Sequence, residues 1–226
     1  MTSVLVLVLL ILSGLSVLYM PTLAAVFPNI NCGSLDSDSF TDENNITWVG
    51  DARYIKSGER QNVTTSDNTA AFPPFTTRRV VPTGQKNCYS IDVGKGEHVL
   101  LRTHFYSGNS TTDLSCKSAF DLQFNGNHWV TVDTCGGKPF DHQVIYHTKF
   151  DAISVCLAQT DPHRPPFISA IQVISLDDGM YSGVDRNHPL FTLRRRNYGG
   201  DKNVRYAKQS QRYLSNSFIY FLQIVS

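Results

Sequence analysis

Hydrophobic and polar residues alternate most regularly around residue 125. Phe120, Leu122 and Phe124 are separated by single polar residues, and residues 127–132 resume an apolar pattern after Asn125-Gly126. An Asn-Gly pair tolerates the two positive φ angles of a tight turn, and alternation with a period of two is typical of a half-buried strand. The pattern therefore predicts a β-hairpin with a two-residue turn and an aromatic inner face.

The expected hairpin also predicts a disulfide. Around a two-residue turn, opposed residues have numbers with a constant sum, so Leu122 should face Trp129 and Cys116 should face Cys135. Cross-strand Cα distances lie within the reach of a disulfide. We therefore expect a Cys116–Cys135 bond, and we place Trp129 in the core beside Leu122.

The same period of two recurs between residues 79 and 176. Residues 98–106 predict a strand with two faces. Its apolar face carries Val99, Leu101, Thr103 and Phe105, and its mixed face carries His98, Leu100, Arg102, His104 and Tyr106. Other strands are expected at 143–148, 152–158 and 167–176. Many short strands at this spacing predict an all-β protein, a jelly-roll-like antiparallel β-sandwich.

The N-terminal segment has the character of a targeting sequence. Residues Val4–Leu18 are apolar, and no charged residue precedes Asp36. Pro21 breaks the apolar run, and Ala24 provides a small residue at a position that signal peptidase reads. We expect residues 1–24 to be a cleaved signal peptide, with an uncleaved membrane anchor as the alternative. Both place the chain in the secretory pathway, at an extracellular or membrane-associated location on the cell surface.

In the oxidising secretory pathway, cysteines can form disulfides and sequons can be glycosylated. Five cysteines can form at most two disulfides. Three of them have no register argument, so their pairing is left open: Cys32, Cys88 and Cys156. Glycosylation is expected at three sequons in polar, turn-like surroundings, at Asn45, Asn62 and Asn109.

Charge and histidine spacing exclude two function classes. A formal net charge of +1 argues against a nucleic-acid partner. No metal or other cofactor is expected, because the histidines are spaced unfavourably for shared coordination. His98 and His104 would stand roughly 20 Å apart along one strand, and His142 and His147 would point to opposite faces.

A glycoside hydrolase is the catalytic alternative, because such enzymes place two carboxylates across a cleft. Four aspartates lie near the expected hairpin: Asp113, Asp121, Asp133 and Asp141. Asp121 and Asp133 would fall on opposite faces, and the sequence has no nucleophile elbow or Cys/His signature. We therefore expect a protein that is not an enzyme.

Several short motifs together resemble the malectin-like extracellular domain of plant receptor-like kinases. They are Ile30-Asn31-Cys32-Gly33, Trp48-Val49-Gly50-Asp51 with Tyr54-Ile55, Asn87-Cys88-Tyr89, residues 101–109, Phe120-Asp121-Leu122, Trp129, Val155-Cys156-Leu157 and residues 166–171. Their order and spacing over residues 26–181 make the match specific. The resemblance implies a β-sandwich at the cell surface that binds cell-wall carbohydrate. A protein-interaction module for a secreted peptide, a co-receptor or another receptor is the alternative.

The resemblance also suggests ligand-binding residues. Animal malectin holds a glucose disaccharide in an aromatic cluster, and Trp48, Phe105 and Tyr106 align with aromatic positions of that cluster. Tyr89 can also stack on a sugar, because a flat ring complements the C–H face of a pyranose. These four residues are the expected ligand-binding set, with burial in the core as the alternative. Arg78-Arg79 stand near another position that is aromatic in malectin.

The family usually carries two malectin-like modules in tandem. We expect the first to cover residues 25–184. Residues 185–226 resemble the start of a second module that is truncated and ends in a divergent tail. The tail from Ser217 to Val225 is apolar, but it is too short to span a bilayer.

Overall fold

The computed structural model describes residues 27–43, 45–64, 73–81, 86–108, 120–134, 139–177, 179–181, 185–197 and 217–223. Four expectations lie outside these ranges: the signal peptide at 1–24, the sequon at Asn109, and the cysteines Cys116 and Cys135. Within the described ranges the chain is all-β, and a short 3₁₀ turn at Pro73–Phe75 is its only helix. No helix there has the length and apolarity for crossing a membrane.

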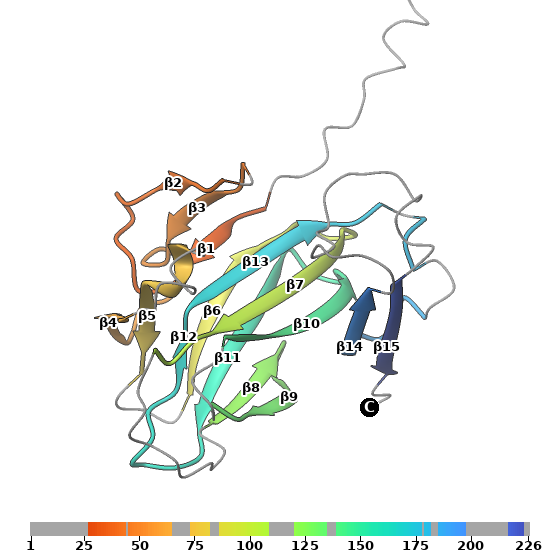
Figure 1. Cartoon of the computed structure of the whole chain (residues 1–226). Coiled ribbons are helices and arrows are strands. Elements are labelled where there is room, and N and C mark those ends of the chain that lie inside the picture. The colour runs from red at the N-terminus through yellow and green to blue at the C-terminus, as the bar shows by residue number, and fades with distance from the viewer. Residues whose placement is uncertain are drawn as a thin grey trace, which may run out of the picture.

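Eight strands form the largest sheet (Figure 1). Their spatial order is β15 (Ser217–Gln223), β14 (Leu190–Asn197), β10 (Phe140–His147), β7 (His98–Phe105), β13 (Ala170–Ser175), β1 (Asn29–Asn31), β3 (Thr47–Gly50) and β2 (Phe40–Thr41). All neighbours in this sheet pair antiparallel except β1 and β3, which run parallel. The parallel pair is the one departure from the antiparallel sandwich that we expected.

Two smaller sheets complete the fold. The four-stranded sheet has the order β6 (Lys86–Asp92), β11 (Ala152–Gln159), β8 (Phe120–Phe124) and β9 (Asn127–Val132). The three-stranded sheet has the order β12 (Phe167–Ile168), β5 (Thr77–Val80) and β4 (Glu59–Asn62). In Figure 1, β13, β7 and β10 cross the centre in front of β6 and β11.

The core lies between the large sheet and the four-stranded sheet. Phe105 of β7 packs against Phe120 of β8, with ring centroids 5.9 Å apart, and both are fully buried. The opposite face of β7 is covered as well, because Leu100 packs with Ile145 and Leu190 in a second cluster. The jelly-roll-like β-sandwich is therefore confirmed, and its central strand is buried on both faces.

The hairpin is confirmed, but its register is not as expected. Asn125 and Gly126 have φ angles of 48° and 85°, as their turn requires. Beyond the turn a bulge shifts the pairing, so Leu122 lies opposite Val130 rather than Trp129. Trp129 still points into the core, as we expected, and its ring centroid lies 6.1 Å from that of Phe124.

The described disulfide joins Cys88 of β6 to Cys156 of β11, which lie directly opposite each other. Cys32 is a free, buried thiol. The bulge removes the register argument for pairing Cys116 with Cys135. That bond stays a prediction.

The large sheet continues past residue 184, where we expected the first module to end. β14 pairs with the edge of β10, and β15 pairs with β14. Leu190 and Phe191 are buried, so the first residues of β14 pack within the first module. The start of a second module beyond them stays a prediction.

Candidate functional site

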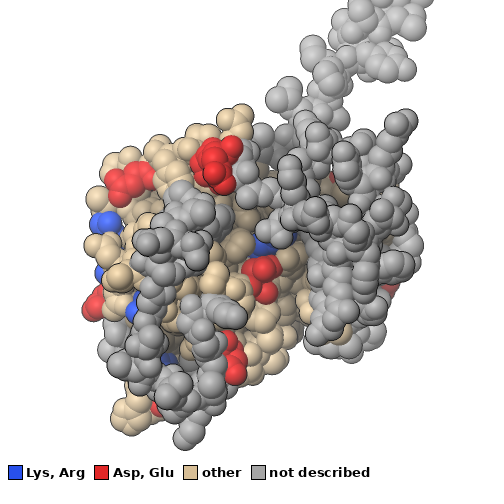
Figure 2. Space-filling view, in the orientation of Figure 1, with Lys and Arg blue, Asp and Glu red and all other residues tan. Residues whose placement is uncertain are grey.

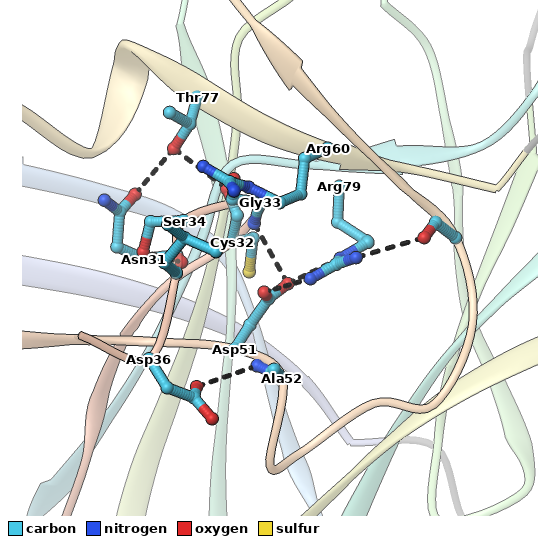
Figure 3. Close-up of polar contacts among 12 residues, drawn as sticks. Asn31, Cys32, Gly33, Ser34, Asp36, Asp51, Ala52, Arg60, Thr77 and Arg79 are labelled. Carbon is cyan, nitrogen blue, oxygen red and sulfur yellow. Dashed lines mark hydrogen bonds and ion pairs between the residues drawn. The ribbon is translucent and has the colours of Figure 1, made fainter. Parts of the chain in front are cut away.

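A buried carboxylate, that of Asp51, is the centre of a hydrogen-bond network next to β1, β3 and β5 (Figure 3). Asp51, directly after β3, is fully buried and forms a bidentate ion pair with Arg79 of β5. Its carboxylate also accepts hydrogen bonds from the Gly33 backbone N–H at 3.0 Å and the Tyr89 hydroxyl at 2.9 Å. The Arg79 guanidinium donates in addition to the Gly58 carbonyl at 3.0 Å. One carboxylate thus connects all three sheets, because Asp51 follows β3, Arg79 is on β5 and Tyr89 is on β6.

The electrostatics of this network favour a structural role. Burial raises the pKa of the Cys32 thiol, and the charge of Asp51 raises it further. Burial likewise raises the pKa of the Tyr89 phenol, and the nearby Cys32 and Asp51 add to the rise. The hydrogen bond with Asp51 is the main cause that raises the pKa of Arg79. A protonated, buried thiol is inert as a nucleophile, so the cluster offers no covalent chemistry.

Two glycines of the family-like motifs are required by close packing around this network. Gly33 has a φ of +79°, and a Cβ there would lie 2.2 Å from the Arg78 carbonyl oxygen. A Cβ on Gly50 would lie 2.2 Å from the Leu35 carbonyl oxygen. Both contacts are with backbone, which does not move aside easily. These motifs therefore specify packing.

The four expected ligand-binding aromatics are all fully buried. Trp48, Tyr89, Phe105 and Tyr106 each have 0% exposure. Trp48 donates its indole N–H to Asp42 at 3.1 Å, and the Tyr106 ring lies 5.3 Å from that of Phe75. None of the four offers an open ring face for a sugar in this structure. Their role in ligand binding stays a prediction, and the structure shows them as packing residues.

Arg78, near which the resemblance to malectin implied an aromatic position, is held by internal contacts. Its guanidinium lies over the Phe167 ring, 4.8 Å from the centroid. It also donates to the Ser107 carbonyl at 3.1 Å and to the Gln61 side-chain oxygen at 3.0 Å. These contacts fix Arg78 against the sandwich, where it stacks on an internal ring.

An open hollow lies beside the β8–β9 turn, the end of β10 and the start of β14. Its volume is about 270 Å³. Three aromatic side chains line it, from Phe124, Tyr146 and Phe191. The remaining lining residues come from the β8–β9 hairpin (Asn125, Asn127 and His128), from the connection after β10 (Lys149) and from the connection before β14 (Asn187, His188 and Pro189). We did not foresee this site, because its residues are far apart in sequence and form no motif.

Hydrogen bonds hold several polar residues of the hollow in place. The Asn125 amide oxygen accepts the Ser154 backbone N–H at 2.8 Å. His188 Nδ1 lies 2.7 Å from Asp185, whose other carboxylate oxygen accepts the Asn187 backbone N–H at 2.9 Å. That backbone hydrogen bond, followed by the one with His188, lowers the pKa of the Asp185 carboxyl. The hollow is therefore a preformed feature.

Two of the three sequons fall on described residues, and both asparagines are exposed. Asn45 has a φ of 63° in the connection between β2 and β3. Asn62 ends β4, which is an edge strand of the three-stranded sheet. Glycosylation of these positions stays a prediction.

The aspartates considered for catalysis form no common site among the described residues. Asp121 on β8 accepts a hydrogen bond from Thr131 at 2.7 Å, whereas Asp141 on β10 lies 3.7 Å from Arg102 in the other sheet. Asp133 is exposed, and Asp113 lies outside the described residues. In the same ranges no group of three or more His, Cys, Asp or Glu residues is arranged to hold a metal ion.

Sequence comparison settles the family. The family model described as "Malectin-like domain" matches residues 30–214. The chain belongs to the malectin-like family. It is 35% identical over 187 residues to the uncharacterized protein At1g24485 of Arabidopsis thaliana, covering 79% of this chain and 35% of that protein. It is 31% identical over 161 residues to the leucine-rich repeat receptor-like serine/threonine-protein kinase At2g14510 of the same plant, covering 69% of this chain and 18% of the kinase.

Solved malectin-like structures share the fold. The ANX1 ectodomain of Arabidopsis thaliana superposes with a TM-score of 0.62 at 20% identity, covering 78% of this chain and 50% of that one. A structure of the peptide RALF23 in complex with FER and LLG2 matches with a TM-score of 0.59 at 16% identity, covering 76% of this chain and 48% of that one. The chain thus spans about a fifth of the receptor-like kinase and about half of the solved ectodomain chains.

Proposed function

We infer that this malectin-like chain is a non-catalytic, extracellular ligand-binding module whose ligand is a polypeptide. The observation that carries the proposal is the complete burial of Trp48, Tyr89, Phe105 and Tyr106. A sugar-stacking site needs an open ring face, and these rings have none. Polypeptide recognition needs no such platform. The RALF23 complex with FER and LLG2, a structural relative, supports this choice.

Cell-wall carbohydrate, our expectation from the sequence, is the second candidate. The observation in its favour is the hollow near Tyr146, which combines aromatic side chains with amide groups. Such a combination is common in sites for small polar ligands. The two candidates differ in the chemistry of the ligand, so they can be separated directly.

Immobilised secreted chain would be exposed to extracellular fluid from plant tissue, and binding would be followed by interferometry. We expect protease treatment of the fluid to abolish binding and periodate oxidation of its sugars to leave binding intact. The opposite result would establish carbohydrate as the ligand and overturn the proposal. Incubation with cell-wall oligosaccharides should leave their chain lengths unchanged, and measurable cleavage would contradict a non-catalytic module.

A further inference from the structure

The described polar side chains that line the hollow between the β8–β9 turn and the start of β14 are basic or neutral, and none is acidic. The titratable members of the lining are Lys149, His128, His188 and Tyr146, and its three asparagines can donate amide hydrogens. Among the described lining residues none carries a carboxylate. On the β14 side, Asp185 is hydrogen-bonded to His188 and to the Asn187 backbone. On the hairpin side, Asp121 is held by Thr131 and lies 3.5 Å from His128.

Lys149 provides the full positive charge of this lining. Its side chain is exposed, and within the described part of the chain no carboxylate lies within ion-pair distance of it. A carboxylate that enters the hollow would therefore meet an ammonium group and several N–H donors. Charge-assisted hydrogen bonds of this kind are stronger than neutral ones.

An exposed hydrophobic side chain follows the lysine of the hollow. Three large hydrophobic side chains are exposed among the described residues: Leu35, Phe150 and Leu193. One of them is next to a lining residue in the chain, because Phe150 directly follows Lys149. Phe150 exposes 71% of its surface. An exposed hydrophobic side chain next to a polar recess is typical of protein-binding surfaces.

The aromatic side chains within the hollow do not form a sugar platform. Tyr146 and Phe191 are each 7% exposed, and Phe124 is 1% exposed. Stacking on a pyranose requires a ring face in the open, and these three residues are at most 7% exposed. The lining therefore suits a small polar group better than a stacked sugar.

We propose that this hollow receives an acidic residue of a polypeptide partner, whose adjacent apolar side chain rests on Phe150. This inference rests on the proposed function, because it takes the ligand to be a polypeptide. The site shares no residue with the hydrogen-bond network of Asp51. Lys149 binds the carboxylate, and the rim asparagines orient it. Because β10 and β14 both contribute lining residues, the site exists only while β14 is paired with β10.

Isotope-labelled secreted chain would be titrated with two peptides and followed by NMR. The peptides acetyl-Leu-Asp-Leu-amide and acetyl-Leu-Asn-Leu-amide have nearly the same shape and differ in one charge. We expect the aspartate peptide to shift the amide resonances of Asn125, Lys149 and Asn187 and to bind about fivefold more tightly, which equals about 1 kcal/mol. Equal affinities, or shifts confined to other regions, would overturn the proposal. Shifts by galacturonic acid without shifts by the aspartate peptide would assign the hollow to acidic sugars instead.

Variants give an independent test with matched controls. Lys149→Glu should abolish the preference for the aspartate peptide, and Lys149→Arg should retain it. Phe150→Ser should weaken both peptides equally. The controls Lys56→Glu and Leu35→Ser make the same changes at exposed positions outside the hollow, and they should bind as the unmodified chain does. If Lys149→Glu still captured a protease-sensitive ligand from extracellular fluid with unchanged affinity, the hollow would be the wrong site while the proposed function would stand.

Discussion

Removal of the Asp51 charge is the sharpest test of how this fold is held together. Asp51→Asn keeps the shape of the side chain but replaces an anion by a neutral amide. The side chain of Asp51 is completely buried, and that of its partner Arg79 is only 10% exposed. The substitution leaves the guanidinium buried without its anion and weakens the acceptor for Gly33 and Tyr89. Breaking a buried pair from one side costs about 3–5 kcal/mol.

That loss would be measured by urea unfolding of the secreted chain. For a domain of this size, a loss of about 3–5 kcal/mol in the free energy of unfolding lowers the melting temperature by about 6–20 °C. The surface pair of Asp141 with Arg102 provides the control, because Asp141 is 38% exposed and the two groups are 3.7 Å apart. Asp141→Asn should cost less than about 1 kcal/mol.

The double variant decides whether the pair acts as one unit. Asp51→Asn combined with Arg79→Met removes both buried charges, so its cost should be well below the sum of the two single costs. The reasoning would be refuted by a double variant that costs the full sum, or by an Asp51→Asn variant within about 1 kcal/mol of the unmodified chain.

Three further outcomes are expected. Replacing Cys88 and Cys156 by Ala opens a loop of 68 residues and should lower the free energy of unfolding by about 4 kcal/mol in the same urea assay, whereas an unchanged midpoint would contradict this. Burial lowers the pKa of His104 from 6.5 to about 4, so the unfolded chain takes up the proton first as the pH falls. Stability present above pH 6.5 should decline by about 3 kcal/mol towards pH 4, and His104→Gln should reduce that slope. Tyr106→Ala should cost about 3–5 kcal/mol because its ring is buried, and a nearly unchanged melting temperature would restore Tyr106 as a surface residue.

The sequence predicted strands far better than it predicted their partners. Asn125-Gly126 fixed the hairpin turn, because few other pairs accept two positive φ angles. The bulge beside Leu122 was less visible, although Trp129 and Val132 carry a signal of it. Both are buried on one strand although they are three positions apart, which strict alternation forbids. Cys88 and Cys156 meet only because β6 and β11 are neighbours, and no local pattern reveals that.

Burial of the four aromatic residues could not be decided from the sequence for a related reason. Alternation along residues 98–106 showed which residues share a face, but it did not show that both faces of β7 are covered. Phe105 and Tyr106 therefore looked available although neighbouring elements bury them both. The hollow escaped notice because Asn125, Lys149 and Asn187 come together only through the packing of three separate connections.

The position of β1 constrains how the chain can mature. Asn29 lies opposite Gln172 at a sequence separation of 143, and β1 is enclosed by β13 on one side and β3 on the other. During synthesis the first strand emerges long before its antiparallel neighbour exists. It can pair with β3 early, but the sheet cannot close until β13 has been made. Closure of the sheet therefore waits until Ser175 at the end of β13 has been made, and until then the N-terminal strand has an unpaired edge.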